Sequence, residues 1–222
     1  MLGADGAPVE DVTRSHQAWM HFIVTRDDLA TFAHLHPEPT GQPGELAVDV
    51  AFPTPGRYLI HTEFRRQGQM NDILSRDEVT VAGPPAPTAV PIPGPREQIV
   101  DGVRITLHGD AHAGEGSDFT FSFSDAVTGR PVDDLQPYLA AAGHGVSMRA
   151  DGTAFAHGHA EVEDASGEPV FALPGQRFGP ELGFHTRFDT PGTYQLWAQF
   201  RLADGSVVTA PFTVSALERQ SS

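Results

Sequence analysis

The feature that most constrains the fold of this chain is an internal repeat. Residues 7–38 align without a gap to residues 130–161 at an offset of 123 positions, the distance from His21 to His144. A second pair of blocks, residues 51–66 and 187–202, matches at an offset of 136. The identical positions of the first block include Pro8, Val9, Asp11, His21, Arg26, Asp28, Phe32, Ala33, His34 and His36. The chain is therefore expected to contain two tandem copies of one domain.

A Pro-dense segment, GPPAPTAVPIPGPREQ at residues 83–98, separates the two copies. Such a composition favours an extended spacer over a helix or a central strand. We therefore expect a first domain over residues 1–82, a linker over 83–98, a second domain over 99–218 and a tail over 219–222.

The local pattern of the second copy predicts short β-strands separated by Asp-Gly, Thr-Gly and Pro-Gly turns. A helix is plausible only over Val132–Gly143, which is short and broken by Pro, and we expect that segment to cross between sheets. Seven strands in such a domain indicate an immunoglobulin-like β-sandwich. The expected strands are Val103–Gly109, Asp118–Ala126, His144–Ala150, Thr153–Val162, Phe184–Asp189, Thr193–Leu202 and Val207–Val214.

The first copy has fewer residues before the repeated block than the second, so its sandwich is expected to lack about two N-terminal strands. Unpaired strand edges recruit other strands. Two explanations stay open. Either the chain is a fragment whose N-terminal region carried those strands and an export signal, or another chain or the insert Gly68–Arg76 covers the gap.

The chemistry-bearing element is a predicted hairpin around Asp151-Gly152. A two-residue turn there pairs His144 with His159 and Val146 with His157. Side chains two apart on a strand share a face, so three imidazoles are expected to converge on the face that also carries Met148 and Phe155, taken as core-facing. The first copy keeps the same spacing in His21, His34 and His36.

Fourth ligands are predicted at His185 in the second domain and at the matched Asp49 in the first. His185 is expected to need a bulge, because the alternation of Phe184, Thr186 and Phe188 turns it away from the core. The remaining imidazoles are expected at the surface, namely His16, His61, His108 and His112.

Composition narrows the chemistry further. The chain has no Cys, no Lys and a formal net charge of −15. Thiolate chemistry and Cys-type zinc sites are thereby excluded, and a nucleic-acid partner is disfavoured. No apolar run is long enough for a membrane span, and residues 1–15 contain no export signal of the usual kind. Imidazole, carboxylate and thioether groups are left as metal ligands.

Three functions remain open. The first is Cu or Zn binding by the His clusters. The second is a His₃ metalloenzyme of cupin-like or other type, although Glu161 and Glu163 in an acidic loop are the only candidates for a general base. The third is a metal-free interaction module. Catalysis is the less favoured expectation, because no nucleophile or nucleotide-binding motif is present.

The stretches GH, FAHGH, GFHTRFDTPGTYQLWAQF and TAPFTV resemble a group of bacterial extracytoplasmic His-rich immunoglobulin-like domains associated with heavy-metal, chiefly copper, handling. The resemblance covers Pro131–Val214 well and Pro8–Val81 in part. It implies a β-sandwich with ligands at His144, His157, His159 and His185. It also implies a periplasmic or secreted location and, as a partner, a metal-transport or membrane protein.

Overall fold

The computed structural model describes residues 1–114, 116–160, 162–163, 166 and 169–218. The chain divides into two compact units, Met1–Val90 and Pro91–Ser222, and the division falls inside the Pro-dense segment. The described residues form strands, turns and loops and include no helix, and thus none that could cross a bilayer. The segment 132–143, where a helix was considered, contains turns and isolated bridges instead.

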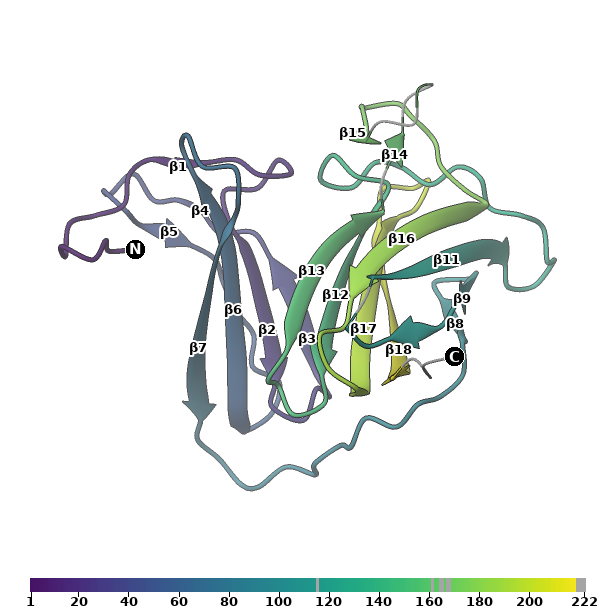
Figure 1. The fold of residues 1–222 in the computed structure, drawn as a ribbon, viewed down its shortest axis with the longest axis horizontal. Coiled ribbons are helices and arrows are strands. Elements are labelled where there is room, and N and C mark those ends of the chain that lie inside the picture. The colour runs from purple at the N-terminus through teal and green to yellow at the C-terminus, as the bar shows by residue number, and fades with distance from the viewer. Residues whose placement is uncertain (115, 161, 164–165, 167–168, 219–222) are drawn as a thin grey trace. The chain divides into compact units, whose positions relative to one another are not determined.

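The second unit contains two sheets that together make a β-sandwich (Figure 1). In the first sheet the order is β10 (Ala111–His112), β18 (Val207–Leu217), β17 (Gly192–Arg201), β12 (Gly143–Arg149) and β13 (Phe155–Ala160). In the other, the order is β16 (Glu181–Arg187), β11 (Gly116–Asp125), β9 (Val103–His108) and β8 (Glu97–Val100). A small pair, β14 (Val162–Glu163) and β15 (Pro169–Val170), completes the described strands of this unit.

Aromatic side chains fill the space between these two sheets. Phe121 of β11 packs against Phe200 of β17 with ring centroids 5.2 Å apart, and Phe123 lies 4.7 Å from the same ring. The residues of β17 that enter this core alternate along the strand, as expected for a pleated sheet with one face inward. They are Tyr194, Leu196, Ala198 and Phe200.

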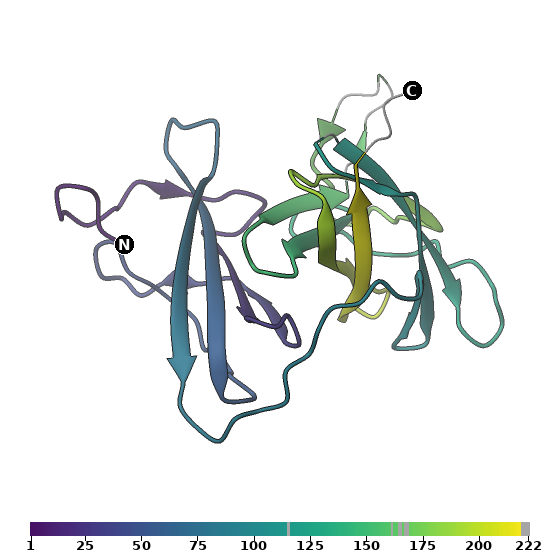
Figure 2. The ribbon, with the colours of Figure 1, turned by 60° about the horizontal axis from the view of Figure 1, so that its bottom comes forward.

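The first unit has one large sheet (Figure 1). Its strands are β1 (Val12–Thr13), β6 (Gly56–Arg66), β2 (His21–Arg26) and β3 (Phe32–Leu35), and β7 (Ile73–Val81) also pairs with β6. Figure 2 shows the long strands β6 and β7 side by side. A separate pair, β4 (Glu38–Pro39) and β5 (Leu46–Ala47), lies outside this sheet.

The two units correspond strand by strand over one sheet only. The pairing of β7, β6, β2 and β3 repeats that of β18, β17, β12 and β13. Within residues 1–90, all of which the structure describes, no strand corresponds to β8, β9 or β11. The insert Gly68–Arg76 does not cover the gap, because its last residues run along β6 as part of β7, with Ile73 opposite Phe64.

A tyrosine corner occurs at the same place in both units. Tyr58 Oη donates a hydrogen bond to the Thr54 carbonyl oxygen at 2.8 Å, and Tyr194 Oη donates to the Thr190 carbonyl oxygen at 2.9 Å. The repeated TPG-x-Y sequence makes both contacts, and such corners are typical of immunoglobulin-like sandwiches. The predicted fold class is confirmed, since the chain is all-β with two related β-sandwich repeats, the first incomplete.

Candidate metal centres

The predicted register of the second hairpin is confirmed. In the pairing of β12 with β13, His144 lies opposite His159, Val146 opposite His157 and Met148 opposite Phe155. In the first unit β2 pairs with β3 in the same register, with Ile23 opposite His34. The imidazoles of each cluster therefore lie on two neighbouring strands of a continuous sheet, except that His36 directly follows the end of β3.

The turns of the two hairpins differ from the predicted two-residue turn. Gly152 has a φ of +70° and its N–H donates to the Arg149 carbonyl oxygen at 2.8 Å, while Asp151 keeps an ordinary negative φ. A type I′ turn would need positive φ at both residues. Leu29, the counterpart of Gly152, adopts φ +61° with the equivalent bond to the Arg26 carbonyl oxygen. Both copies thus use one loop geometry despite the Gly-to-Leu difference.

An Arg–Asp pair braces each hairpin turn. Asp151 receives hydrogen bonds from the backbone N–H and the hydroxyl of Thr153 and pairs with Arg149. These contacts, with those of Thr153 first, lower the pKa of the Asp151 carboxyl. In the first unit the corresponding Arg26–Asp28 pair is buried, with side chains 8% and 3% exposed.

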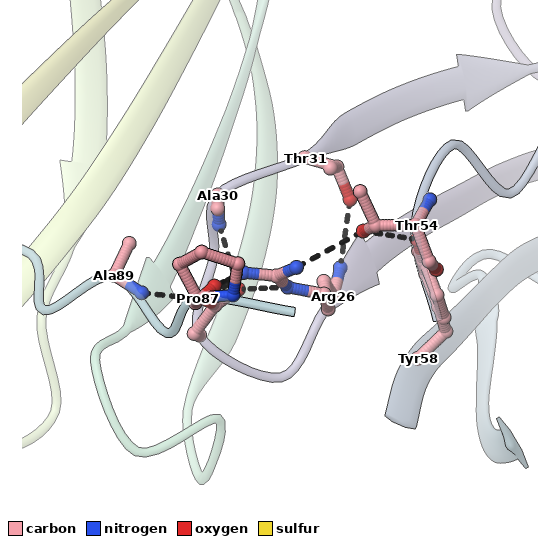
Figure 3. A network of polar contacts seen from close by, with 8 residues as sticks. Arg26, Ala30, Thr31, Thr54, Tyr58, Pro87 and Ala89 are labelled. Atoms are coloured by element: carbon pink, nitrogen blue, oxygen red, sulfur yellow. Dashed lines mark hydrogen bonds and ion pairs between the residues drawn. The ribbon is translucent and has the colours of Figure 1, made fainter. Parts of the chain in front are cut away.

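The buried pair also holds part of the Pro-dense segment (Figure 3). Arg26 donates to the Pro87 carbonyl oxygen and to the Thr54 hydroxyl, and the Ala89 N–H donates to Asp28 at 2.7 Å. The Arg26 hydrogen bond is the main cause that lowers the pKa of Asp28 to about 2. The turn between the two His-bearing strands is therefore tied to residues 87–89.

The three imidazoles of the first unit gather closely. The His21 and His36 ring centroids are 5.2 Å apart, and those of His34 and His36 are 4.7 Å apart. The His21 Nδ1 and His34 Nε2 atoms lie 3.0 Å from each other. One nitrogen from each ring falls within 4.8 Å of the other two.

The second unit brings its own three imidazoles together. The His144 ring centroid lies 4.5 Å from that of His159 and 5.5 Å from that of His157. The His144 Nδ1 and His157 Nε2 atoms are 3.2 Å apart, and His144 Nε2 lies 3.0 Å from the Tyr138 carbonyl oxygen. Since a carbonyl only accepts, His144 Nε2 carries the proton and Nδ1 presents a lone pair. Metal-ligating imidazoles are commonly fixed in this way.

The distances between these imidazole nitrogens match those expected for two nitrogens bound to the same metal ion. Two nitrogens about 2.05 Å from one ion lie about 2.9 Å apart at a right angle and about 3.3 Å apart at the tetrahedral angle. The observed separations of 3.0 and 3.2 Å fall between these limits. In the first unit a nitrogen of the third imidazole, His36, also lies within 4.8 Å of both of the others.

The His clusters do not lie on the core side of their sheet, contrary to expectation. His144, Val146 and Met148 share a face with Gln195, Trp197 and Gln199 of β17, whereas the sandwich core takes the alternate residues. The reason is Phe184, which occupies the core side of Gly145; a Cβ there would sit 2.3 Å from the Phe184 ring. The glycines of β12 thus leave room for the opposite sheet.

The structure does not bring the two predicted fourth ligands to the clusters. His185 lies on the exposed face of β16, where its Nδ1 is 2.7 Å from an Asp118 carboxylate oxygen, and no bulge redirects it. Asp49 is exposed in the loop after β5. Glu161 of the acidic loop lies outside the described residues, as does the tail at 219–222. Of the imidazoles expected at the surface, His108 is exposed and His16 and His112 are half-buried.

Two further side chains lie on the face of the first cluster, through the pairing of β6 with β2. His61 lies opposite Ile23 and is buried, so the expectation that it lies at the surface is wrong. Glu63, which the sequence reasoning missed, lies opposite His21. Burial lowers the pKa of His61 to about 4, with a smaller contribution from Arg76. The corresponding residues in the second unit are Trp197 and Gln199. Strand pairing, rather than any local motif, was the signal that would have found Glu63.

Several solved structures are distantly similar to this chain. A candidate lipoprotein from Bacillus anthracis is 10% identical with a TM-score of 0.32, covering 55% of this chain and 77% of that one. CopC from Methylosinus trichosporium is 14% identical with a TM-score of 0.29, covering 53% and 97%. A beta-glycosidase from Bacteroides vulgatus is 13% identical with a TM-score of 0.30, covering 90% and 21%.

No protein with a curated description matches the sequence. One family model does match, over residues 1–80 and 98–218, so that most of both units is included. The chain therefore belongs to the family described as domain of unknown function DUF8832.

Proposed function

We propose that each unit binds one transition-metal ion through its three imidazoles. The observation that carries this proposal is the gathering of His21, His34 and His36, with one nitrogen of each within 4.8 Å of the others. The same three positions recur in the second unit while neighbouring strand residues differ. Packing alone gives no reason to keep three imidazoles on one face twice.

The ligand set suits Cu or Zn. Neutral imidazole binds both ions, and by the usual order of affinity among divalent ions Cu²⁺ binds more tightly than Zn²⁺. The first cluster has a carboxylate, Glu63, opposite His21, where the second has the amide of Gln199 opposite His144. Glu63 is the fourth ligand of the proposed first site, and its negative charge favours a divalent cation there.

The proposed role is extracytoplasmic sequestration, transfer or sensing of the metal, with a metal-transport or membrane protein as the partner. Binding is favoured over catalysis because the carboxylate next to the first cluster, Glu63, is proposed as a ligand, and the second cluster has the amide of Gln199 at that position. The resemblance to extracytoplasmic His-rich domains supports the proposed location.

The test is metal stoichiometry in the full chain purified without an affinity tag. Calorimetric titration with Cu²⁺ and with Zn²⁺, joined to elemental analysis, is expected to give two ions per chain. His34→Ala with His36→Ala should remove one ion, and His157→Ala with His159→Ala should remove the other. Glu63→Gln should weaken the first site alone.

Matched controls come from imidazoles outside the clusters. His185→Ala and His108→Ala should leave stoichiometry and affinity unchanged, since both side chains are exposed elsewhere. Loss of an ion in His185→Ala would contradict the assignment of the second site. Wild-type stoichiometry in both double variants would contradict the proposal as a whole.

A further inference from the structure

A groove of about 690 Å³ lies on the first unit, on the face of its sheet opposite the His cluster. Met20, which precedes β2, Phe22 of β2 and Phe64 of β6 form its apolar floor, and Leu46, Val48 and Val50 form one wall. Phe22 and Phe64 are only half-buried. The groove therefore leaves large apolar side chains partly open, which is uncommon for the interior face of a sandwich sheet.

The second unit shows what covers the corresponding face. Phe64 corresponds to Phe200, and Phe200 is covered by Phe121 and Phe123 of β11, with ring centroids 5.2 and 4.7 Å away. Strand β11 in turn pairs with β16 on one side and β9 on the other. The first unit has no strand in the place of β11 within residues 1–90.

The neighbouring place, that of β16, is already filled in the first unit. At the offset of 136, Leu46, Val48 and Val50 correspond to Leu182, Phe184 and Thr186 of β16. Val48 is smaller than its counterpart Phe184, whereas Phe22 is larger than its counterpart Gly145. Val48 and Phe22 line the same groove. By sequence, residues 46–50, of which Leu46–Ala47 form β5, take the position of β16, and we take the open part of the groove as the β11 position.

The groove differs from the β11 site in charge. Asp77 of β7 lines it and takes the position of Phe212, since Asp77 lies opposite Ile60 as Phe212 lies opposite Leu196. In the second unit the Phe121 ring lies 5.9 Å from Phe212 and 5.2 Å from Phe200. A side chain at the Phe121 position would therefore lie between Phe64 and Asp77. Glu45 adds a second carboxylate to the lining.

We propose that this groove binds an extended segment of another polypeptide, with large apolar side chains at alternate positions and a basic side chain at the place of Phe121. The strand would pair with residues 46–50 as β11 pairs with β16, which is the usual mode of strand addition. The alkyl part of the basic side chain would lie on Phe64 and its charge would meet Asp77. The net charge of −15 attracts such a segment as well.

The probes are two fluorescently labelled peptides that copy residues 117–125, one with the native sequence and one with Phe121→Lys. Anisotropy titrations use the full chain. The Lys peptide should bind saturably, at least tenfold more tightly than the native peptide, and Asp77→Asn should remove that advantage. Glu78→Gln is the matched control. It removes the same charge from the next residue of β7, which lies opposite Leu59 on the other face and should leave binding unchanged.

Three results would overturn the proposal. The first is that neither peptide binds saturably at millimolar concentration. The second is that wild type and Asp77→Asn bind the Lys peptide equally well. The third is a dimer in sedimentation experiments that Asp77→Lys dissociates, because the groove would then hold a second copy of this chain. None of these results depends on metal binding, so the His-cluster proposal is judged separately.

Discussion

The Arg26–Asp28 pair is the most deeply buried ion pair among the described residues. Its hydrogen bonds reach Thr54, Pro87 and the Ala89 N–H, so both charged groups have several partners. A buried pair of this kind adds little beyond its desolvation cost, but removal of one partner leaves an uncompensated charge. The repeat contains a natural comparison in Arg149–Asp151, whose side chains are 30% and 48% exposed.

We predict that Asp28→Asn destabilises the first unit by about 3 kcal/mol at pH 7, because Arg26 loses its carboxylate in a buried position. Asp151→Asn should cost less. The Asp28 pKa of about 2 lies below the ordinary value of 3.8. Its ionisation therefore stabilises the fold above pH 3.8 by roughly 2 kcal/mol, and this contribution is lost as the pH falls through 2.

The measurement is denaturant unfolding of wild type and both variants at pH 7 and at pH 2.5. The gap between wild type and Asp28→Asn should narrow at the lower pH. A gap of constant size would show that the charge of Asp28 is not the source of the stability.

At the scale of the element, a tight turn precedes each His-bearing hairpin. Residues 15–18 and 138–141 are closed by reciprocal backbone hydrogen bonds of 2.9–3.1 Å. The two central residues have positive φ in both cases, +47° and +65° at His16 and Gln17 and +51° and +60° at Leu139 and Ala140. This is type I′ geometry, which normally selects Asn-Gly. The turn in the second unit also positions the Tyr138 carbonyl that orients His144.

Replacement of Leu139-Ala140 by Asn-Gly is expected to stabilise the second unit by about 1 kcal/mol, since non-Gly residues pay a steric cost in the left-handed region. The same exchange at His16-Gln17 should stabilise the first unit similarly. Urea midpoints measure both effects. A lower midpoint for the Leu139-Ala140 exchange would mean that the packing of these side chains outweighs the backbone strain.

The strands and the register of the hairpin could be predicted because alternation and the Asp-Gly turn are local signals. The side of the sheet that carries the His cluster could not, because Val146 and Met148 look like core residues while Gly145 does not. Only the opposite sheet, through Phe184, reveals that the glycine side is the packed one. The positions of Glu63 and His185 depend likewise on strand pairs distant in sequence.

At the scale of the whole molecule, the two units have unequal cores. The second has a sandwich interior of buried residues drawn from both sheets. The first has one large sheet whose interior face remains half-open at the groove. Burial of apolar area is the main stabilising contribution to a fold. We therefore expect the first unit to be less stable than the second.

Differential scanning calorimetry of the full chain should therefore resolve two transitions, the first unit unfolding at the lower temperature. Asp28→Asn should lower the first transition alone. Phe121→Ala should lower the temperature of the second transition alone, because loss of a buried Phe side chain typically costs about 3–5 kcal/mol in the free energy of unfolding. A single transition that both variants shift would show that the two units unfold together.

At one place the two units combine a small and a large residue in opposite order. The second unit has Gly145 on β12 and Phe184 on β16, and the first unit has Phe22 on β2 and Val48 after β5. A crossover between the two repeats within a gene would join a strand from one copy to a partner from the other. One hybrid would set Phe against Phe where only a glycine fits, and the reciprocal hybrid would set Gly against Val and leave a hole. Both products are expected to fold poorly, so this steric pairing opposes the exchange of segments between the two repeats.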